Sequence, residues 1–373
     1  MAQPGWATEE GTLRYTKRLE GKIPQAHFRQ AHGLWLSSIG IGTYLGNHDD
    51  AADDLYKQAV IRTLELGGNV IDSAINYRFQ RSERAIGTAL SELGQKGLGR
   101  SEIVIATKGG FIPFDGAPPQ SVRSYFEETF VRPGIAGFAD VIQGCHCMTP
   151  KYLLHQLEQS RRNLGLDCID IYYVHNPETQ LAEISRGEFS ERLWRAFEAL
   201  EGAVAQGKIR MYGTATWNGY RNDPSAKDYL SLVEVAEIAR KAGGERHHFK
   251  VIQLPLNLAM AEAFTSRNQE LGGEKISTLE AAQRLDITVM SSASILQGQL
   301  ARELPAFIGE VFDDLRTDAQ RSLQFVRSTP GVTVALVGMK QIRHVEENFS
   351  AAQIPPASLD QYTRLFKAAS SES

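Results

Sequence analysis

The sequence predicts an α/β protein that folds as a single closed (β/α)8 barrel of the TIM type, with long loops after some strands and an N-terminal extension. Three observations support this prediction. Short apolar runs alternate with helical stretches, eight such units follow one another, and the composition shows no break between them. This pattern is typical of a parallel barrel surrounded by helices. An open doubly wound sheet, the main rival, usually carries a glycine-rich turn after its first strand, and residues 40–46 hold only two of its three glycines in register.

Each predicted strand is a continuous run of β-branched and aliphatic residues, as expected where a strand is buried on both faces. The first run covers residues 34–43 and ends in glycines. The expected strands are 36–41, 70–72, 103–107, 169–174, 209–214, 251–254, 288–291 and 332–337. The expected helices are 49–66, 83–93, 151–164, 191–206, 226–242, 278–285 and 318–328.

The barrel is expected to span residues 34–353, between an N-terminal extension (residues 1–33) and a C-terminal tail (residues 354–373). Within the extension, residues 11–19 resemble a short hairpin. The intervals 111–150 and 259–277 both follow strands and are too long for simple connections. Because loops after barrel strands lie over the functional face, we expect these segments to act as lids or to set specificity.

The composition is that of a soluble globular protein, with 373 residues, of which 42% are hydrophobic and 23% charged. A net charge of −4 gives no electrostatic case for binding nucleic acid or an anionic membrane. Three cysteines are too few for a disulfide framework, and the N-terminus lacks a basic and apolar export signal. We therefore expect a cytoplasmic protein.

Polar residues end three consecutive strands. Asp72, Lys108 and His175 occupy these ends, and Tyr77 lies in the loop between the first two. A barrel collects such residues on one rim. An ammonium group at Lys108 is expected to lower the pKa of the Tyr77 phenol, and Asp72 to keep that lysine charged. The set suits a general acid aimed at a carbonyl, which is what hydride transfer from a nicotinamide requires.

Other catalytic arrangements fit less well. The chain offers neither a nucleophile and base pair of the Ser-His kind nor two facing carboxylates. Taken singly, each of the four residues has an ordinary structural interpretation, and their order along the chain is what favours catalysis. Cys145-His146-Cys147 lacks a second ligand pair at metal-binding spacing, so no metal site is expected. His146 and Trp217 are candidates for the substrate pocket.

The motifs together resemble the aldo-keto reductase family, in its bacterial form. They fall in family order between about residues 40 and 348: Asp72-Ser73-Ala74, Tyr77, Ser82-Glu83, Gly87, Ala89-Leu90, Thr107-Lys108, and Asp170 to His175 followed by Pro177. The resemblance implies NADPH-dependent interconversion of a carbonyl (aldehyde, ketone or sugar) and an alcohol. It also implies a catalytic tetrad of Asp72, Tyr77, Lys108 and His175, with Tyr77 as the acid.

The resemblance further implies a set of residues that bind NADP. The candidates are Gly42, Thr43, Tyr44, Thr214, Trp217, Gln253, Ser292, Gln297, Gly338, Lys340, His344, Glu347 and Asn348. The family pattern is altered at three places. Residues 214–216 replace a Ser-Asn pair that grips the carboxamide, Ser292 replaces a stacking aromatic, and Lys340 replaces an arginine for the 2'-phosphate, which still favours NADPH over NADH.

The expected partner is therefore a small carbonyl or alcohol substrate, and the oligomeric state stays open. A second interpretation is a nicotinamide-nucleotide sensor or partner subunit with little turnover, as in channel-associated relatives of the family. A third is a lyase or isomerase barrel that uses no cofactor.

Overall fold

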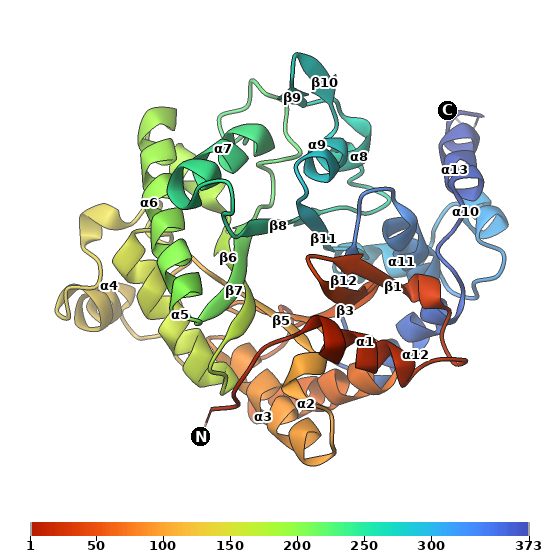
Figure 1. The fold of residues 1–373 in the computed structure, drawn as a ribbon, viewed down its shortest axis with the longest axis horizontal. Coiled ribbons are helices and arrows are strands. Elements are labelled where there is room, and N and C mark those ends of the chain that lie inside the picture. Colours follow the sequence, from red (N-terminus) through yellow and green to blue (C-terminus); the bar gives the residue numbers. More distant parts are fainter. Residues whose placement is uncertain (1, 372–373) are drawn as a thin grey trace.

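A computed structural model describes residues 2–371 and shows a closed barrel of eight parallel strands ringed by helices (Figure 1). The strands run around the barrel in the order β11, β12, β3, β4, β5, β6, β7, β8. Their bounds are β3 (Ile39–Gly42), β4 (Val70–Asp72), β5 (Val104–Gly109), β6 (Ile169–His175), β7 (Ile209–Ala215), β8 (Phe249–Pro255), β11 (Thr288–Ser292) and β12 (Val334–Gly338). The predicted (β/α)8 fold is confirmed.

One main helix follows each barrel strand. These helices are α2 (Asp50–Glu65), α3 (Arg81–Gln95), α5 (Pro150–Leu164), α6 (Arg186–Ala205), α7 (Leu232–Gly243), α9 (Thr278–Arg284), α11 (Asp318–Ser328) and α12 (Ile342–Ser350). Side-chain caps begin several of them, as at Asp49, which accepts the Ala52 N–H at 2.8 Å. The predicted start of α7 at residue 226 is wrong, because Ser231 caps that helix by accepting the Glu234 N–H.

The N-terminal segment differs from its prediction in two ways. Residues 11–19 are not a hairpin, because Glu9–Lys17 forms helix α1, capped by Thr8. The apolar run 34–43 contains two strands rather than one. Its first part, β2 (Leu34–Ser37), pairs antiparallel with β1 (Phe28–Ala31), and the barrel begins only at Ile39, so the boundary expected at residue 34 falls one strand too early. A short 3-10 helix, η1 (Gln25–His27), precedes β1.

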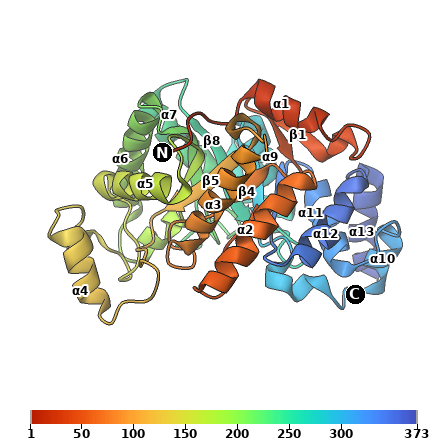
Figure 2. The ribbon, with the colours of Figure 1, turned by 90° about the horizontal axis from the view of Figure 1, so that it is seen from below.

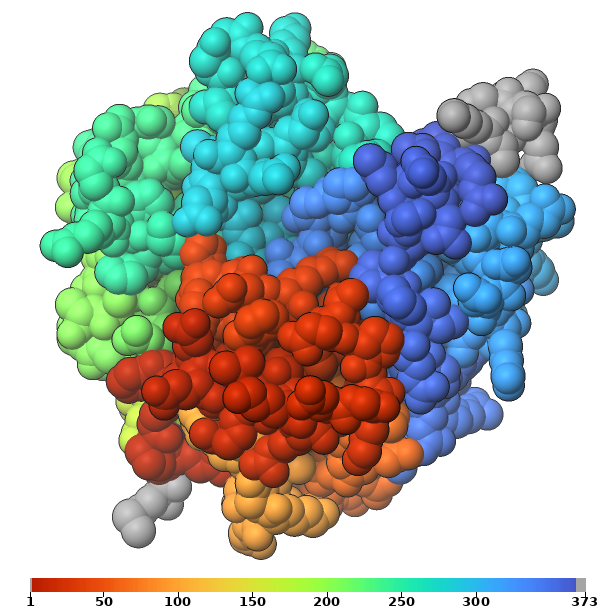
Figure 3. All heavy atoms as spheres, turned by 45° about the vertical axis from the view of Figure 1, so that its right-hand side comes forward, coloured from red at the N-terminus to blue at the C-terminus, as the bar shows by residue number. Residues whose placement is uncertain are grey.

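The β1–β2 hairpin covers one end of the barrel. Leu34 and Leu36 pack in the same apolar cluster as Val70, Val104 and Val334 from the barrel strands. A separate and larger cluster fills the layer between the strands and the helices. Figure 3 shows the N-terminal segment as a broad red surface beside the blue C-terminal elements.

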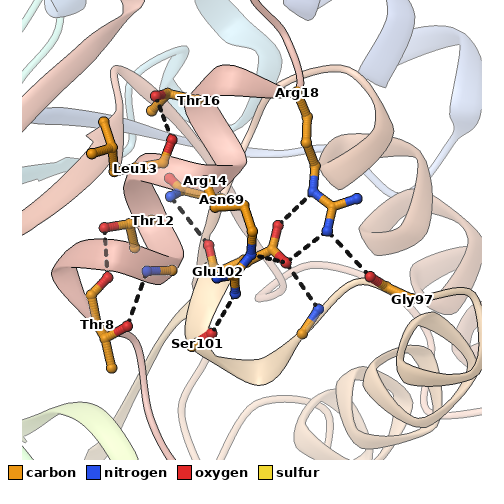
Figure 4. Close-up of polar contacts among 12 residues, drawn as sticks. Thr8, Thr12, Leu13, Arg14, Thr16, Arg18, Asn69, Gly97, Ser101 and Glu102 are labelled. Atoms are coloured by element: carbon orange, nitrogen blue, oxygen red, sulfur yellow. Dashed lines mark hydrogen bonds and ion pairs between the residues drawn. The ribbon is translucent and has the colours of Figure 1, made fainter.

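Glu102 fastens α1 to the barrel. It ends a 3-10 helix, η2 (Arg100–Glu102), just before β5, and its side chain is only 1% exposed. Its carboxylate lies 3.2 Å from Arg14 Nε and 2.8 Å from Arg18 Nε, and accepts the Gly99 N–H (Figure 4). Asn69 links the β1–β2 hairpin to the barrel, because its side-chain amide forms hydrogen bonds with the backbone of β2.

The loops after the barrel strands contain elements of their own. The β5–α5 interval contains α4 (Val122–Phe126), a π-helical turn η3 (Glu127–Val131) and η4 (Phe138–Asp140), packed on a small core of their own. The β8–α9 interval contains α8 (Glu262–Thr265) and a hairpin of β9 (Gln269–Leu271) and β10 (Glu274–Ile276). The sequence did not reveal a third insertion, with η6 (Leu296–Ala301) and α10 (Ala306–Val311). Two of these elements, α4 and α10, lie low in Figure 2, while α1 and β1 lie at the top.

The remaining elements are short or terminal. A 3-10 segment η5 (Pro177–Ala182) follows β6, η7 (Ala351–Gln353) follows α12, and the C-terminal tail contains α13 (Leu359–Ser371). Among residues 2–371, no helix has both the length and the apolar character needed to cross a bilayer.

Candidate active site

The four residues expected to act together do lie together, on the rim where the strands end. Asp72 ends β4, Lys108 lies near the end of β5, and His175 ends β6. The parallel pairing of these strands brings the three positions side by side. Tyr77 enters from the loop between β4 and α3, and its ring centroid lies 5.9 Å from that of His175.

Lys108 and Asp72 form a buried ion pair. Lys108 Nζ lies 2.6 Å from Asp72 Oδ2 and donates to the Ser73 carbonyl oxygen at 2.7 Å. The second carboxylate oxygen of Asp72 accepts the Gln253 side-chain N–H at 2.8 Å. Burial lowers the pKa of Lys108, and the Asp72 charge opposes that shift. Because an ammonium has three donors, two of which are used here, one donor remains.

Tyr77 holds its proton tightly in this structure. Its ring lies 5.0 Å from Lys108 Nζ and its centroid 4.9 Å from that of Tyr44. Burial and the negative charge of Asp72 raise the pKa of Tyr77 well above its usual value. The expected lowering by Lys108 is therefore wrong for the free protein, because desolvation of the phenolate outweighs the ammonium. Tyr77 is a neutral phenol with a proton to donate.

His175 is an uncharged imidazole. Burial, followed by the positive charge of Lys108, holds its pKa well below the ordinary value. Phe111 packs perpendicular to the His175 ring with centroids 5.0 Å apart. Nδ1 of His175 is buried without a hydrogen-bond partner among the described residues. A neutral imidazole can donate one hydrogen bond.

His146 supports the backbone of His175 instead of lining the pocket, where it was expected. It is fully buried, and its Nε2 lies 2.7 Å from the His175 carbonyl oxygen, which can only accept. Nδ1 therefore accepts from Gln180 Nε2 at 2.9 Å, and this pair of contacts fixes the tautomer. No group of three or more metal-ligating side chains occurs in the described part of the chain, Cys145 and Cys147 included.

Three consecutive residues after Tyr77 adopt left-handed backbone conformations. Their φ angles are 48° at Arg78, 57° at Phe79 and 69° at Gln80. Such conformations cost on the order of 1–2 kcal/mol for each non-glycine residue. Tertiary contacts hold them: the buried Arg78 side chain donates to the Asn47 carbonyl oxygen at 2.7 Å and pairs with Asp53.

A cavity of about 880 Å³ opens in front of these residues. Asp72, Tyr77 and His175 line it, whereas Lys108 lies behind them with no exposure. The predicted cofactor residues that line it are Gly42, Thr43, Tyr44, Trp217, Gln253, Ser292, Gln297, Gly338, His344, Glu347 and Asn348. The volume falls within the range of small-molecule and cofactor sites.

Two predicted cofactor residues lie outside the cavity wall. Thr214 is fully buried, and its hydroxyl bonds the Tyr220 hydroxyl at 2.6 Å. Lys340 follows β12, and its side chain approaches Gly46. Thr214 is therefore committed to its tyrosine, and the contact of Lys340 with a cofactor stays a prediction, since Lys340 lies two residues after the lining residue Gly338.

The comparisons with known proteins decide the family. A model described as the aldo/keto reductase family matches residues 38–232, which is more than half of the chain. This chain belongs to the aldo/keto reductase family. The membership confirms the predicted enzyme class.

Two Schizosaccharomyces pombe relatives align with most of this aldo/keto reductase. One is described as a putative voltage-gated potassium channel subunit beta and is 24% identical over 350 residues, covering 91% of each chain. The other, aldo-keto reductase yakc [NADP(+)], is 23% identical and covers 85% of this chain and 84% of its own.

A solved aldo/keto reductase from Klebsiella pneumoniae, in complex with NADP and acetate, superimposes with a TM-score of 0.63 at 22% identity. The match covers 92% of this chain and 95% of that one. It shows that the reductase barrel extends well beyond the residues that the family model matches.

Several cavity residues of this reductase escaped sequence reasoning. They are Leu45, Asn76, Phe111, Asn176, Ala293, Ser294, Ile295 and Gly298. Two of them could have been found, because Asn76 precedes Tyr77 and Asn176 follows His175. The others lie in loops whose path the sequence does not determine.

Proposed function

We propose that this protein transfers a hydride between NADP(H) and a carbonyl or alcohol substrate, with Tyr77 as the general acid in reduction and the general base in oxidation. The observation that carries the proposal is the buried Lys108–Asp72 pair placed 5.0 Å from the Tyr77 ring, measured from Lys108 Nζ. Asp72 and Tyr77 line a cavity large enough for a nucleotide and a small substrate, and Lys108 lies behind them.

The wall of the cavity fits a polar cofactor. Thr216 Oγ1 and Asn348 Oδ1 are buried, belong to the lining and have no partner among the described residues. Buried polar atoms are normally satisfied, so free ones on a cavity wall are suited to a ligand. Thr216 and Gln253 would hold the carboxamide end, and the N-terminal half of α12, with His344 and Asn348, would hold the adenosine end. When bound, the nicotinamide supplies or accepts the hydride.

Side chains of this protein carry out the remaining steps, which are proton transfer and orientation of the substrate. Tyr77 gives its phenolic proton to the carbonyl oxygen, and the Lys108 ammonium favours the phenolate that results. Asp72 holds Lys108 in place and keeps it charged. The neutral His175 imidazole orients the carbonyl oxygen by donating a hydrogen bond.

Two neighbouring cationic side chains favour NADPH over NADH. Lys340 lies two residues after β12, and Arg343 lies in the first turn of α12. Their positive charges would suit an adenosine 2'-phosphate bound at this end of the cavity. The complexes of the Klebsiella pneumoniae structure with NADP agree with this choice. The three cysteines are free, which supports a cytoplasmic location.

Binding and turnover can be tested separately. NADPH fluorescence titrated with the protein is expected to change and saturate at one equivalent, and NADH to bind more weakly. A panel of aldehydes, ketones and sugars followed by NADPH absorbance, and of alcohols followed with NADP, would identify turnover. Stoichiometric binding of NADPH would rule out a lyase or isomerase that uses no cofactor. A protein that binds neither nucleotide would contradict the proposal.

A second candidate is a nucleotide-binding partner subunit with little turnover. It is favoured by the relative described as a putative potassium channel subunit beta and by the altered strand end at Ala215-Thr216. Tight NADPH binding without oxidation by any member of the panel would support this candidate over the first.

A further inference from the structure

Glu178 is a buried carboxylate that the proposed mechanism does not use. It lies in η5, three residues after His175, and is 6% exposed. Its Oε1 accepts the backbone N–H groups of Trp217, Asn218 and Gly219 at 2.7, 3.2 and 3.4 Å. Its Oε2 is buried with no partner in residues 2–371. A single carboxylate oxygen therefore accepts hydrogen bonds from three successive backbone amides in the loop after β7.

Trp217 is the second residue of that loop and forms part of the cavity wall. Its side chain is among the exposed large hydrophobic groups, at 40%. Within the described chain, no hydrogen bond or ring contact engages its indole, and its carbonyl oxygen accepts the Arg221 Nε–H at 3.1 Å. The position of the indole therefore depends on the backbone, which Glu178 holds.

We propose that Glu178 is a positioning residue, which places Trp217 on the substrate side of the cavity and so sets the affinity for a carbonyl substrate with an apolar or aromatic body. Two further aromatic rings line the cavity beside the proposed acid and its partner: Tyr44, 4.9 Å from the Tyr77 ring, and Phe111, 5.0 Å from the His175 ring. The part of the inference that concerns substrate affinity rests on the proposed reductase function. The part that concerns the position of Trp217 does not.

The strength of the hydrogen bonds between Glu178 and the three amides depends on pH. Burial raises the pKa of Glu178 to about 7, although the three amides oppose the shift. Hydrogen bonds to an ionised acceptor are roughly twice as strong as those to a neutral one. Trp217 is therefore held firmly above pH 7 and more loosely below it.

Two other ionisable groups of the adjoining segments are shifted by burial, which lowers the pKa of His175 and raises that of Tyr220. The charged side chains there are engaged elsewhere: Arg221 pairs with Glu262, Lys227 donates to the Ala182 carbonyl oxygen, and Asp228 accepts from Asn218 and Asn222.

The deciding experiment is fluorine NMR on protein labelled with 5-fluorotryptophan, with the Trp217 resonance identified by Trp217→Phe. Trp6, Trp35 and Trp194 give internal reference signals. Between pH 5.5 and 8.5, the Trp217 resonance is expected to titrate with a midpoint near 7. Its solvent isotope shift is expected to be larger at the acid end, because the indole becomes more exposed. Glu178→Gln should abolish the titration, and the matched exposed variant Glu191→Gln should keep it.

A wild-type Trp217 resonance that does not titrate overturns the proposal, even if Glu178→Gln fails to fold. A titration that persists in Glu178→Gln overturns it as well. The second measurement is the KM for 4-nitrobenzaldehyde with saturating NADPH, which should rise about fivefold from pH 8 to pH 6 while kcat changes little. In Glu178→Gln the KM should not depend on pH. A protein without turnover contradicts the reductase function and leaves the NMR titration to decide the role of Glu178.

Discussion

Lys108 Nζ lies 2.6 Å from Asp72 Oδ2, and neither side chain has contact with bulk water beyond 6% of its surface. Two opposite charges are thus held out of water behind the Tyr77 ring. Burying such a pair costs free energy of desolvation. Removing one partner costs more, because the other is then an uncompensated buried charge. Its position makes it the supporting structure of the proposed proton donor.

Removing one partner of the Lys108–Asp72 ion pair should therefore lower the stability of the fold. In Asp72→Asn, the Lys108 ammonium loses its counterion, and the free energy of unfolding is expected to fall by about 3–5 kcal/mol. Urea unfolding at pH 7 measures this loss. The double variant with Lys108→Met should recover a substantial part of it, because no charge is then left unpaired. Lys108→Met alone completes the cycle, and a loss in the double variant equal to the sum of the two single losses would show that the pair contributes no coupling.

Tyr77→Phe removes the phenolic proton and little else. We expect kcat to fall by about 10²–10⁴-fold, the usual contribution of a positioned acid, with NADPH affinity unchanged in a fluorescence titration. Tyr229→Phe is the matched control, because its hydroxyl lies outside the cavity wall and donates to the Asn268 carbonyl oxygen at 2.6 Å. Turnover that survives in Tyr77→Phe would remove Tyr77 from the mechanism.

Gly110 allows His146 to approach the backbone of His175. A Cβ at this position would lie 2.8 Å from His146 Nε2 and 3.0 Å from the His175 carbonyl oxygen, and φ is +141°. Gly110→Ala should therefore displace His175 and lower kcat by at least about tenfold, since small misplacements of a reacting group are expensive.

Gly116→Ala is a useful comparison for that variant. Gly116 lies in the same loop with φ at +72°, and a Cβ there would contact nothing within 4 Å. This variant carries backbone strain without the steric clash, so its kcat should stay near that of the wild type. Similar losses in both variants would show that loop strain, and not the position of His175, controls the rate.

Buried histidines should make the protein sensitive to acid. Burial lowers the pKa of His27 from 6.5 to about 3. Between these values the unfolded chain binds a proton that the folded protein excludes, so stability falls as the pH drops from about 6.5 towards 3, by up to about 1.4 kcal/mol per pH unit. His27→Gln should lessen the slope of unfolding free energy between pH 4 and 6. The exposed His48→Gln should leave it unchanged, and an identical slope in His27→Gln would refute the assignment.

The barrel and the four rim residues could be predicted because their signals are local. Apolar runs mark strands buried on both faces, and a polar residue after such a run emerges at the rim. The break between Leu34–Ser37 and Ile39–Gly42 could not be read in the same way. Both strands are apolar and nearly continuous, and only the pairing of β2 with β1 separates them.

Features that depend on distant contacts escaped prediction. The left-handed conformation of Arg78 is held by Asn47 and Asp53, which lie in another βα unit. Glu178 resembles a solvated loop residue in the sequence, and its role follows from amides 39 to 41 positions away. The pKa of Tyr77 was predicted in the wrong direction because the sequence shows which charges are near but not how little water reaches them.

The apolar hairpin that carries Leu34 and Leu36 covers one end of the barrel, and the cavity lies at the other end, where the strands finish. The two ends can therefore be modified independently. A fusion partner or an immobilising support attached ahead of α1 should leave the cavity accessible to diffusing small molecules. Shortening the chain past β2 would instead expose the inner lining of the barrel to water, so the hairpin belongs to the smallest piece of this chain that can be expected to fold.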